Sequence, residues 1–294
     1  MNLRDLQYLV TTADELHFGR AAELCNVSQP TLSMQLKKLE DTLGTQLFER
    51  TNKSVRLTET GRDVVAHARN ILAEAEQIRQ LAHLAADPLA GEIRLGVFPT
   101  LAPYLLPSLM PKLKNAFPKL NVLLVEEKTP ELVNRLSLGE IDCALLAMPV
   151  AQGGFSALPL FNEPFLVAVP VSHRLAGKIS ISYDDIRQET MLLLEDGHCL
   201  REQALDVCHT IGIGEANRFR ATSLETLLHM VASGNNITLV PKLAIRRHDD
   251  YLRYIPFSGT VPFRTIGLYS RPTSARKVLF AKIAELIKDE YAHL

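Results

Sequence analysis

The segment that most constrains the fold is a leucine stripe near the N-terminus. Steps of four and three residues separate Leu32, Leu36, Leu39 and Leu43. This period predicts an amphipathic helix with one buried face. The helix has a favoured N-cap in Ser28, and Pro30 falls in its first turn, where a missing amide proton costs little. A shorter helical pattern at 18–24 and a tight turn at 26–27 precede it, so the segment predicts a helix-turn-helix.

The face opposite the leucines is polar and partly basic. Amide and hydroxyl side chains at the start of such a helix can read base edges in a major groove, and lysines farther along can meet phosphates. A basic segment at 50–56 follows, which predicts a wing that contacts the DNA backbone. The candidate DNA-binding residues are Ser28, Gln29, Pro30, Thr31, Ser33, Gln35, Lys37, Lys38, Arg50, Lys53 and Arg56. A small solvated helical bundle with an ordinary polar face explains the pattern equally well.

Overall charge and hydropathy narrow the class of protein. The net charge is −1 over 294 residues, which argues against a bulk nucleic-acid coat protein but permits a local basic face. The sequence contains no apolar run of about 18 residues, so we expect no membrane span. The N-terminus has an early acidic residue, Asp5, and no apolar segment, so it does not read as a signal peptide. We therefore expect a cytoplasmic protein.

Five motifs in the N-terminal region occur in the order and spacing of a known family. They are Phe18-Gly19-Arg20-Ala21-Ala22, the segment Val27 to Ser33, Lys38-Leu39-Glu40, Leu43-Gly44 and Leu47-Phe48-Glu49-Arg50. Together they resemble the winged helix-turn-helix of LysR-type transcriptional regulators. The resemblance implies double-stranded DNA as a partner and resolves the alternative of a simple helical bundle.

A long helix is expected to follow, beginning near Glu59 with Thr58 as its cap. Steps of four and three residues separate Val64, Ala68, Ile71, Ala75, Ile78, Ala82 and Ala85. Such a narrow seam predicts a helix that needs a partner, and the helix's own domain is one possible partner. The LysR resemblance implies instead a dimerisation helix, with a hinge at 87–91.

From residue 92 onward, strand and helix patterns alternate, which predicts an α/β fold with a mostly parallel, covered sheet. The resemblance implies two α/β lobes related to periplasmic binding proteins, with a ligand cleft between them. We expect a winged helix-turn-helix at 1–58, a linker helix at 59–88 and a regulatory region at 89–294. Within the last, lobe I is expected at about 89–162 and 268–294, and lobe II at about 163–267.

The four cysteines fall into two groups. Cys25 and Cys143 have apolar or helix-packing neighbours and are expected to be buried and inert. Cys199 lies between His198 and the nearby Arg201 and is expected to open a helix; positive neighbours and a helix N-terminus favour thiolate. If the helix continues to Cys208, the two Cα atoms lie about 13.5 Å apart, whereas a disulfide tolerates at most about 7 Å. Bond formation would then require unwinding, and two spare thiols remain the alternative.

Four further segments resemble the hydrogen-peroxide-sensing branch of the LysR regulators. They are Leu194 to Arg201 with Cys208 following, Phe219 to Leu227, Gly234 to Pro241, and Arg264 to Leu268. The resemblance implies that Cys199 is the peroxidatic thiol, that Cys208 resolves it, and that Thr100, Thr129, His198 and Arg264 form the peroxide pocket. From pattern alone, the two threonines are helix caps. One departure is Arg218, where the branch predicts a histidine.

The resemblance also implies partners: RNA polymerase, further copies of the chain in a dimer of dimers, and a thiol reductant such as glutaredoxin or thioredoxin. Neither a cofactor nor a metal is expected, because no metal-ligand spacing, phosphate loop or hydrolytic triad is present. Two alternatives stay open. One is a LysR regulator that answers to a small metabolite between the lobes. The other is an enzyme such as a thiol peroxidase, although a winged module and a dimerisation helix have no use in one.

Overall fold

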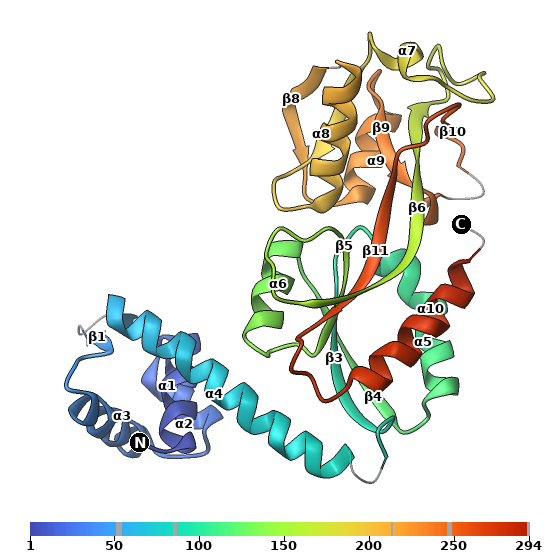
Figure 1. Cartoon of the computed structure of the whole chain (residues 1–294). Coiled ribbons are helices and arrows are strands. Elements are labelled where there is room, and N and C mark those ends of the chain that lie inside the picture. Colours follow the sequence, from blue (N-terminus) through green and yellow to red (C-terminus); the bar gives the residue numbers. More distant parts are fainter. Residues whose placement is uncertain (51–54, 85–86, 213, 246–248, 293–294) are drawn as a thin grey trace. The chain divides into compact units, whose positions relative to one another are not determined.

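A computed structural model describes residues 1–50, 55–84, 87–212, 214–245 and 249–292 (Figure 1). Contacts divide the chain into two compact units. One comprises Met1–Ala86 with Ser137–Glu140, and the other Asp87–Leu136 with Ile141–Leu294.

The first unit is a helical module with a small hairpin. Its elements are α1 (Leu3–Glu15), α2 (Phe18–Leu24), α3 (Gln29–Leu43), β1 (Phe48–Arg50), β2 (Val55–Leu57) and α4 (Glu59–Leu84). The Ser28 hydroxyl accepts the Thr31 amide at 3.4 Å and caps α3, while Asn26 turns the chain with φ 54°. Strands β1 and β2 pair antiparallel with Glu49 opposite Arg56. The predicted helix-turn-helix and hairpin are therefore present.

Helix α4 differs along its length. The Thr58 hydroxyl accepts the Gly61 amide at 2.8 Å, as expected of a cap. Near its start, Ala68 is 1% exposed in the core of this module, whereas Ile71 and Ile78 are 43% and 69% exposed. The first turns thus pack on their own module, and the later seam positions do not. The side chain of Ala82 and the whole of Ala85 lie outside the described part of the chain.

The second unit alternates strands and helices. Its elements begin with β3 (Gly91–Val97), α5 (Ala102–Ala116), β4 (Leu120–Glu126), α6 (Thr129–Ser137), β5 (Cys143–Met148) and β6 (Ser156–Pro170). They continue with α7 (Tyr183–Ile186), β7 (Thr190–Leu194), α8 (Cys199–Ile211), β8 (Gly214–Ala221), α9 (Leu224–Ala232) and β9 (Thr238–Pro241). They end with the short 3₁₀ turn Lys242–Ala244, β10 (Leu252–Pro256), β11 (Phe263–Ser270) and α10 (Lys277–Tyr291).

The sheet is mixed, so the expectation of a mostly parallel sheet was wrong. The main sheet has the order β10-β6-β11-β5-β3-β4, with β9 also paired to β6. Only β3 pairs parallel there, with β4 and β5, while β6 and β11 pair antiparallel with all their neighbours. The reason is that β6 and β11 are long strands that run back through the unit, whereas a parallel sheet needs a βαβ crossover between neighbouring strands (Figure 1).

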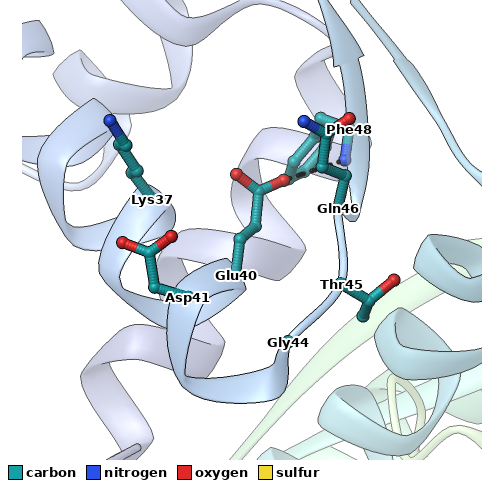
Figure 2. Close-up of a pocket in the computed structure, with 7 residues that line it drawn as sticks. All are labelled: Lys37, Glu40, Asp41, Gly44, Thr45, Gln46 and Phe48. Carbon is teal, nitrogen blue, oxygen red and sulfur yellow. Dashed lines mark hydrogen bonds between the residues drawn. The ribbon is translucent and has the colours of Figure 1, made fainter.

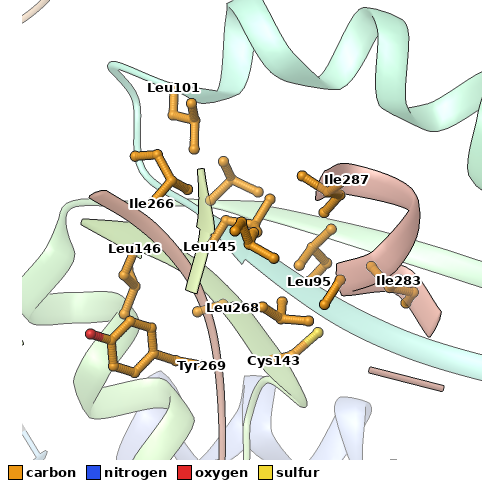
Figure 3. Packing of buried hydrophobic residues seen from close by; sticks show 14 of the residues in the cluster. Leu95, Leu101, Cys143, Leu145, Leu146, Ile266, Leu268, Tyr269, Ile283 and Ile287 are labelled. Atoms are coloured by element: carbon orange, nitrogen blue, oxygen red, sulfur yellow. The ribbon is translucent and has the colours of Figure 1, made fainter. Parts of the chain in front are cut away.

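Two separate hydrophobic cores give this unit two lobes. The first lobe packs α5, α6 and α10 around β3 and β5, and includes Leu95, Cys143 and Ile283 (Figure 3). The second lobe packs α8 and α9 around β7 and β9. Strand β6 contributes Phe161 to the first core and Phe165 to the second, so it passes from one lobe to the other. The expected lobe limits at 162/163 and 267/268 fall within β6 and β11.

Candidate functional site

Cys199 and Cys208 lie on one continuous helix. Cys199 is the first residue of α8, and Cys208 follows nine positions later, before the helix ends at Ile211. At a rise of about 1.5 Å per residue, their Cα atoms lie about 13.5 Å apart. Cys208 is 2% exposed, and its thiol contacts Met191 Sδ at 3.6 Å. The helical segment predicted from the sequence is confirmed, and its geometry excludes a disulfide without local unwinding.

A buried ion pair lies between the strands that cross the lobes. Arg264 on β11 and Glu163 on β6 are register partners, both with fully buried side chains, and Nε donates to Oε2 at 2.7 Å. The same guanidinium donates from Nη1 to Thr100 Oγ1 and from Nη2 to Thr100 O, each at 3.0 Å. Its Cζ lies 5.1 Å from the Phe98 ring centroid. Because Thr100 Oγ1 already accepts a hydrogen bond from Arg264, its own hydroxyl proton remains available for another acceptor.

The Thr100 hydroxyl is close enough to the Cys199 sulfur to lower the pKa of its thiol. Burial raises the pKa of the Cys199 thiol above its ordinary value, and four groups oppose this rise: the Arg264 charge, the Thr129 hydroxyl, the Leu200 amide and the Thr100 hydroxyl. The expected help from the helix N-terminus is present, because the Leu200 amide at the start of α8 lowers the pKa of Cys199. The desolvation cost exceeds the help from the helix N-terminus.

The two positive neighbours expected from the sequence, Arg201 and His198, are not among the groups that lower the pKa of Cys199. Arg201 points its guanidinium at Asp196 and at Leu194 O, with distances of 2.9 and 3.1 Å. Burial, and then the charge of Lys128, lower the pKa of His198, which keeps the imidazole neutral near pH 7. His198 Nε2 is buried and has no hydrogen-bond partner within the described part of the chain. The charge that favours the Cys199 thiolate comes instead from Arg264, which is distant in sequence.

A cavity of about 520 Å³ opens beside Cys199. It is lined from both lobes, by Thr129, Pro130, Val133, Ala147, Met148, Pro149, Val150, Ala151, Gln152, Gly197, Cys199, Glu202, Gln203 and Asp206. One of its buried oxygens, Gln203 Oε1, has no hydrogen-bond partner among the residues that the structure describes. Unpartnered buried polar atoms are costly unless a ligand or water satisfies them. The cavity therefore suits a small polar molecule that reaches the thiol.

The loop ahead of Cys199 is held by ionic contacts from several elements. Lys128, just before α6, forms an ion pair with Glu195 and donates to Asp196 O at 3.2 Å. The Asp196 carboxylate in turn accepts from Arg201 and Arg220, each at 2.9 Å. The loop is thus tied to the first lobe and to two elements of its own lobe.

Three residues of this site were missed in the sequence: Glu163, Phe98 and Lys128. Glu163 stands in the apolar run of β6, and a charged residue inside such a run was a usable signal of a buried pair. No comparable signal marked Lys128, because only the approach of the two lobes gives it a partner. Of the predicted pocket residues, the structure brings Thr100, Thr129 and Arg264 to the thiol, and His198 precedes it in the chain.

The predicted DNA-reading side chains lie along α3. Ser28, Gln29, Pro30, Lys37 and Lys38 are exposed, and Thr31, Ser33 and Gln35 are partly exposed. Arg56 is exposed on β2, whereas Lys53 and the side chain of Arg50 lie outside the described part, as does the Arg218 side chain. The exposed Met34 was overlooked; a thioether can contact thymine methyl groups.

The predicted wing is fastened to the end of α3 through Glu40. One of its carboxylate oxygens accepts the amides of Leu47 and Phe48 at 2.8 and 3.1 Å. Figure 2 shows Glu40 reaching toward Phe48 across a pocket whose wall also carries Lys37 and Gln46. The carboxylate therefore sets where the hairpin leaves the helix.

The other two cysteines take no part in this site. Cys143 is fully buried in the first lobe, as expected (Figure 3), and burial raises the pKa of its thiol well above the ordinary value. Cys25 is the C-cap of α2 and packs against the core of the first unit while staying partly exposed, so the expectation of a buried cysteine holds only in part. A capping residue at a helix end retains an open side toward solvent.

Comparison with known proteins assigns both units. The model of the bacterial regulatory helix-turn-helix proteins of the LysR family matches residues 3–62, and that of the LysR substrate binding domain matches residues 86–292. Over 290 residues the chain is 44% identical to the DNA-binding transcriptional dual regulator OxyR of Escherichia coli, covering 98% of this chain and 95% of that protein.

Comparison with solved structures supports the same assignment. A full-length OxyR variant from Pseudomonas aeruginosa has a TM-score of 0.80 at 39% identity, covering 98% of this chain and 95% of the other. An OxyR variant from Corynebacterium glutamicum, bound to hydrogen peroxide, has a TM-score of 0.69 at 33% identity, covering 99% and 92%. The chain therefore belongs to the LysR family of DNA-binding transcriptional regulators, and the relatives that it resembles over nearly its whole length are OxyR proteins.

Proposed function

We propose that this regulator senses hydrogen peroxide by forming a reversible Cys199–Cys208 disulfide and thereby controls oxidative-stress genes. The observation that carries the proposal is the surroundings of Cys199: a cationic Arg264, two threonine hydroxyls and a cavity lined by the unpartnered Gln203 Oε1 surround one thiol. Hydrogen peroxide is small and has two donors and several acceptors, so it matches such a site.

In the first step, the Cys199 thiolate attacks one peroxide oxygen and the O–O bond breaks. Sulfur loses two electrons and becomes a sulfenic acid, while the other oxygen leaves as hydroxide and takes a proton to become water. Hydrogen-bond donors aimed at the departing oxygen stabilise its developing charge. Thr100 and Thr129 are the proposed donors, and their hydroxyl protons turn from the sulfur to the departing oxygen as the sulfur loses its negative charge. Arg264 holds Thr100, and His198 completes the proposed pocket.

In the second step, the Cys208 thiol attacks the sulfenic sulfur, the new S–S bond forms and water leaves. Since the two Cα atoms start about 13.5 Å apart, α8 must unwind before the bond can close. Leaving the helix also removes Cys208 from the core beside Met191. This rearrangement is the proposed signal, and a thiol reductant such as glutaredoxin or thioredoxin reverses it.

The proposed readout is a change in how the winged module engages DNA and RNA polymerase. The proposed DNA contacts are Arg50, Lys53 and Arg56 of the wing, together with eight residues at the N-cap and along the first turns of α3: Ser28, Gln29, Pro30, Thr31, Ser33, Gln35, Lys37 and Lys38. We further propose a cytoplasmic homotetramer built as a dimer of dimers, in which the exposed Ile71 and Ile78 of α4 face a second copy. Among the described residues, no helix has both the length and the apolar character needed to span a bilayer.

A regulator that binds a small metabolite in the same cavity is the second candidate, favoured by the cavity's size. At about 520 Å³ it is much larger than a peroxide molecule requires. A thiol peroxidase finds no support, because the relatives over the full chain are transcription regulators.

The deciding experiment is peptide mapping by mass spectrometry after brief treatment with near-stoichiometric peroxide. We expect a Cys199–Cys208 bridge that a dithiol reverses, and no bridge in Cys199→Ser. In cells, the same variant should lose its response to peroxide. Free thiols at both positions of the wild type would reject peroxide sensing and favour a metabolite ligand.

A further inference from the structure

We propose that Lys128 is a positioning residue that ties the loop ahead of Cys199 to the first lobe and slows closure of the Cys199–Cys208 disulfide. This inference rests on the proposed function, because it concerns the second step of that chemistry. Lys128 belongs to the first lobe, whereas Glu195 and Asp196 belong to the second.

Lys128 makes two polar contacts and one packing contact with three consecutive loop residues. Its ammonium pairs with the Glu195 carboxylate and donates to Asp196 O at 3.2 Å. Its stem passes so close to Gly197 that a Cβ there would lie 3.2 Å from Cδ. Gly197 also has φ 88°, a conformation that other residues rarely adopt. The lysine therefore lies along the loop rather than touching it at one point.

The tie matters because of where the loop leads. Only His198 separates Gly197 from Cys199, the first residue of α8. For the two thiols to meet, the start of α8 must leave its helical path, and the loop that feeds it must move too. As long as Lys128 holds Glu195 and Asp196, that motion has to break contacts between the lobes. Removing the tie should therefore lower the barrier to closure.

The test compares the rate of disulfide closure in the wild type and in Lys128→Met, which keeps a side chain of similar length without the charge. At peroxide concentrations where closure limits the rate, quenched time courses by mass spectrometry report the second step alone. We expect Lys128→Met to close about two- to five-fold faster, the range expected for losing a half-exposed ion pair. Added salt should accelerate the wild type but not this variant.

Two matched controls separate the tie from a general effect of losing a lysine. Lys128→Arg keeps the charge and should close at the wild-type rate. Lys112 is also half-exposed and paired, with Glu290 on α10, but both partners belong to the first lobe. Lys112→Met should therefore leave closure unchanged. In addition, Glu195→Gln should match Lys128→Met, and the double variant should add little.

A second readout does not depend on oxidation. In the reduced protein, backbone amides of residues 195–201 should exchange hydrogen faster in Lys128→Met than in Lys112→Met. Equal closure rates and equal exchange in those two variants would overturn the inference. A wild type that forms no disulfide, yet shows faster loop exchange in Lys128→Met, would reject the proposed function while leaving the tie established.

Discussion

Arg264 and Glu163 face each other across β11 and β6 with an Nε to Oε2 distance of 2.7 Å, and neither side chain reaches solvent. Register pairing on two adjacent strands sets this contact. The pair lies where both strands cross between the lobes, and its guanidinium also holds Thr100. One buried arginine thus joins the crossing strands to the thiol site.

Glu163→Gln should strongly destabilise the protein. The substitution leaves Arg264 as a buried charge with no counter-charge, and losing one partner of a buried pair typically costs about 3–5 kcal/mol of unfolding free energy. Urea denaturation followed by circular dichroism measures the change. Glu290→Gln, which breaks the half-exposed pair with Lys112, is the control and should cost less than about 1 kcal/mol. Similar losses of unfolding free energy in the two variants would show that the buried pair stabilises the protein no more than the half-exposed pair does.

Oxidation of Cys199 by peroxide should accelerate as pH rises above neutrality. The sign follows from the thiolate being the nucleophile: burial raises the pKa of Cys199, so only a minor fraction is ionised at pH 7, and each rise in pH enlarges it. Stopped-flow measurements of the second-order rate constant between about pH 6 and pH 9 test this predicted acceleration. Proteins of this kind stay folded over about that range. A flat profile would mean that the thiol is already ionised at pH 6.

Thr129→Val should slow the same oxidation about two- to ten-fold at pH 7, the range that one hydrogen bond supports. The Thr129 hydroxyl lowers the pKa of Cys199, so its loss raises that pKa further and reduces the thiolate fraction. The rate–pH profile should therefore shift to higher pH. Thr226→Val, at an exposed position on α9, serves as the control and should leave the profile in place.

Helix stability should govern disulfide closure. Asp206 is exposed between the two cysteines of α8, so Asp206→Ala and Asp206→Gly remove the same side chain but differ in helix propensity by about 1 kcal/mol. If α8 unwinds before the bond forms, the glycine variant should close about four- to five-fold faster than the alanine variant. Quenched mass spectrometry measures both rates. Identical rates would show that the disulfide closes while the turn of α8 around Asp206 stays helical.

The two kinds of α3 side chain should separate in DNA binding. Gln29→Ala should reduce discrimination between operator and random DNA, because amides at the helix start read base edges. Lys38→Ala should weaken binding to all sequences and reduce the slope of log affinity against log salt by about one. Fluorescence anisotropy at several salt concentrations measures both. Unchanged discrimination in Gln29→Ala would remove this residue from the reading face.

The sequence alone determined much of this protein. The leucine stripe and the Ser28 cap defined α3, because helix period and capping are local properties that neighbouring residues carry themselves. The segment from Cys199 to Cys208 was likewise readable as a helix, and the distance between the thiols followed from its rise per residue. The motifs from Phe18 to Arg50 sufficed to recognise the LysR family.

Tertiary structure decided what depends on residues distant in the chain. The direction of the Cys199 pKa depends on burial between the lobes and on Arg264, which sequence neighbours such as Arg201 did not reveal. The pairing of Glu163 with Arg264 requires the antiparallel register of β6 and β11, where a mostly parallel sheet had been expected. Electrostatics and desolvation act through space, so charges brought close by the fold outweigh those that are merely close in sequence.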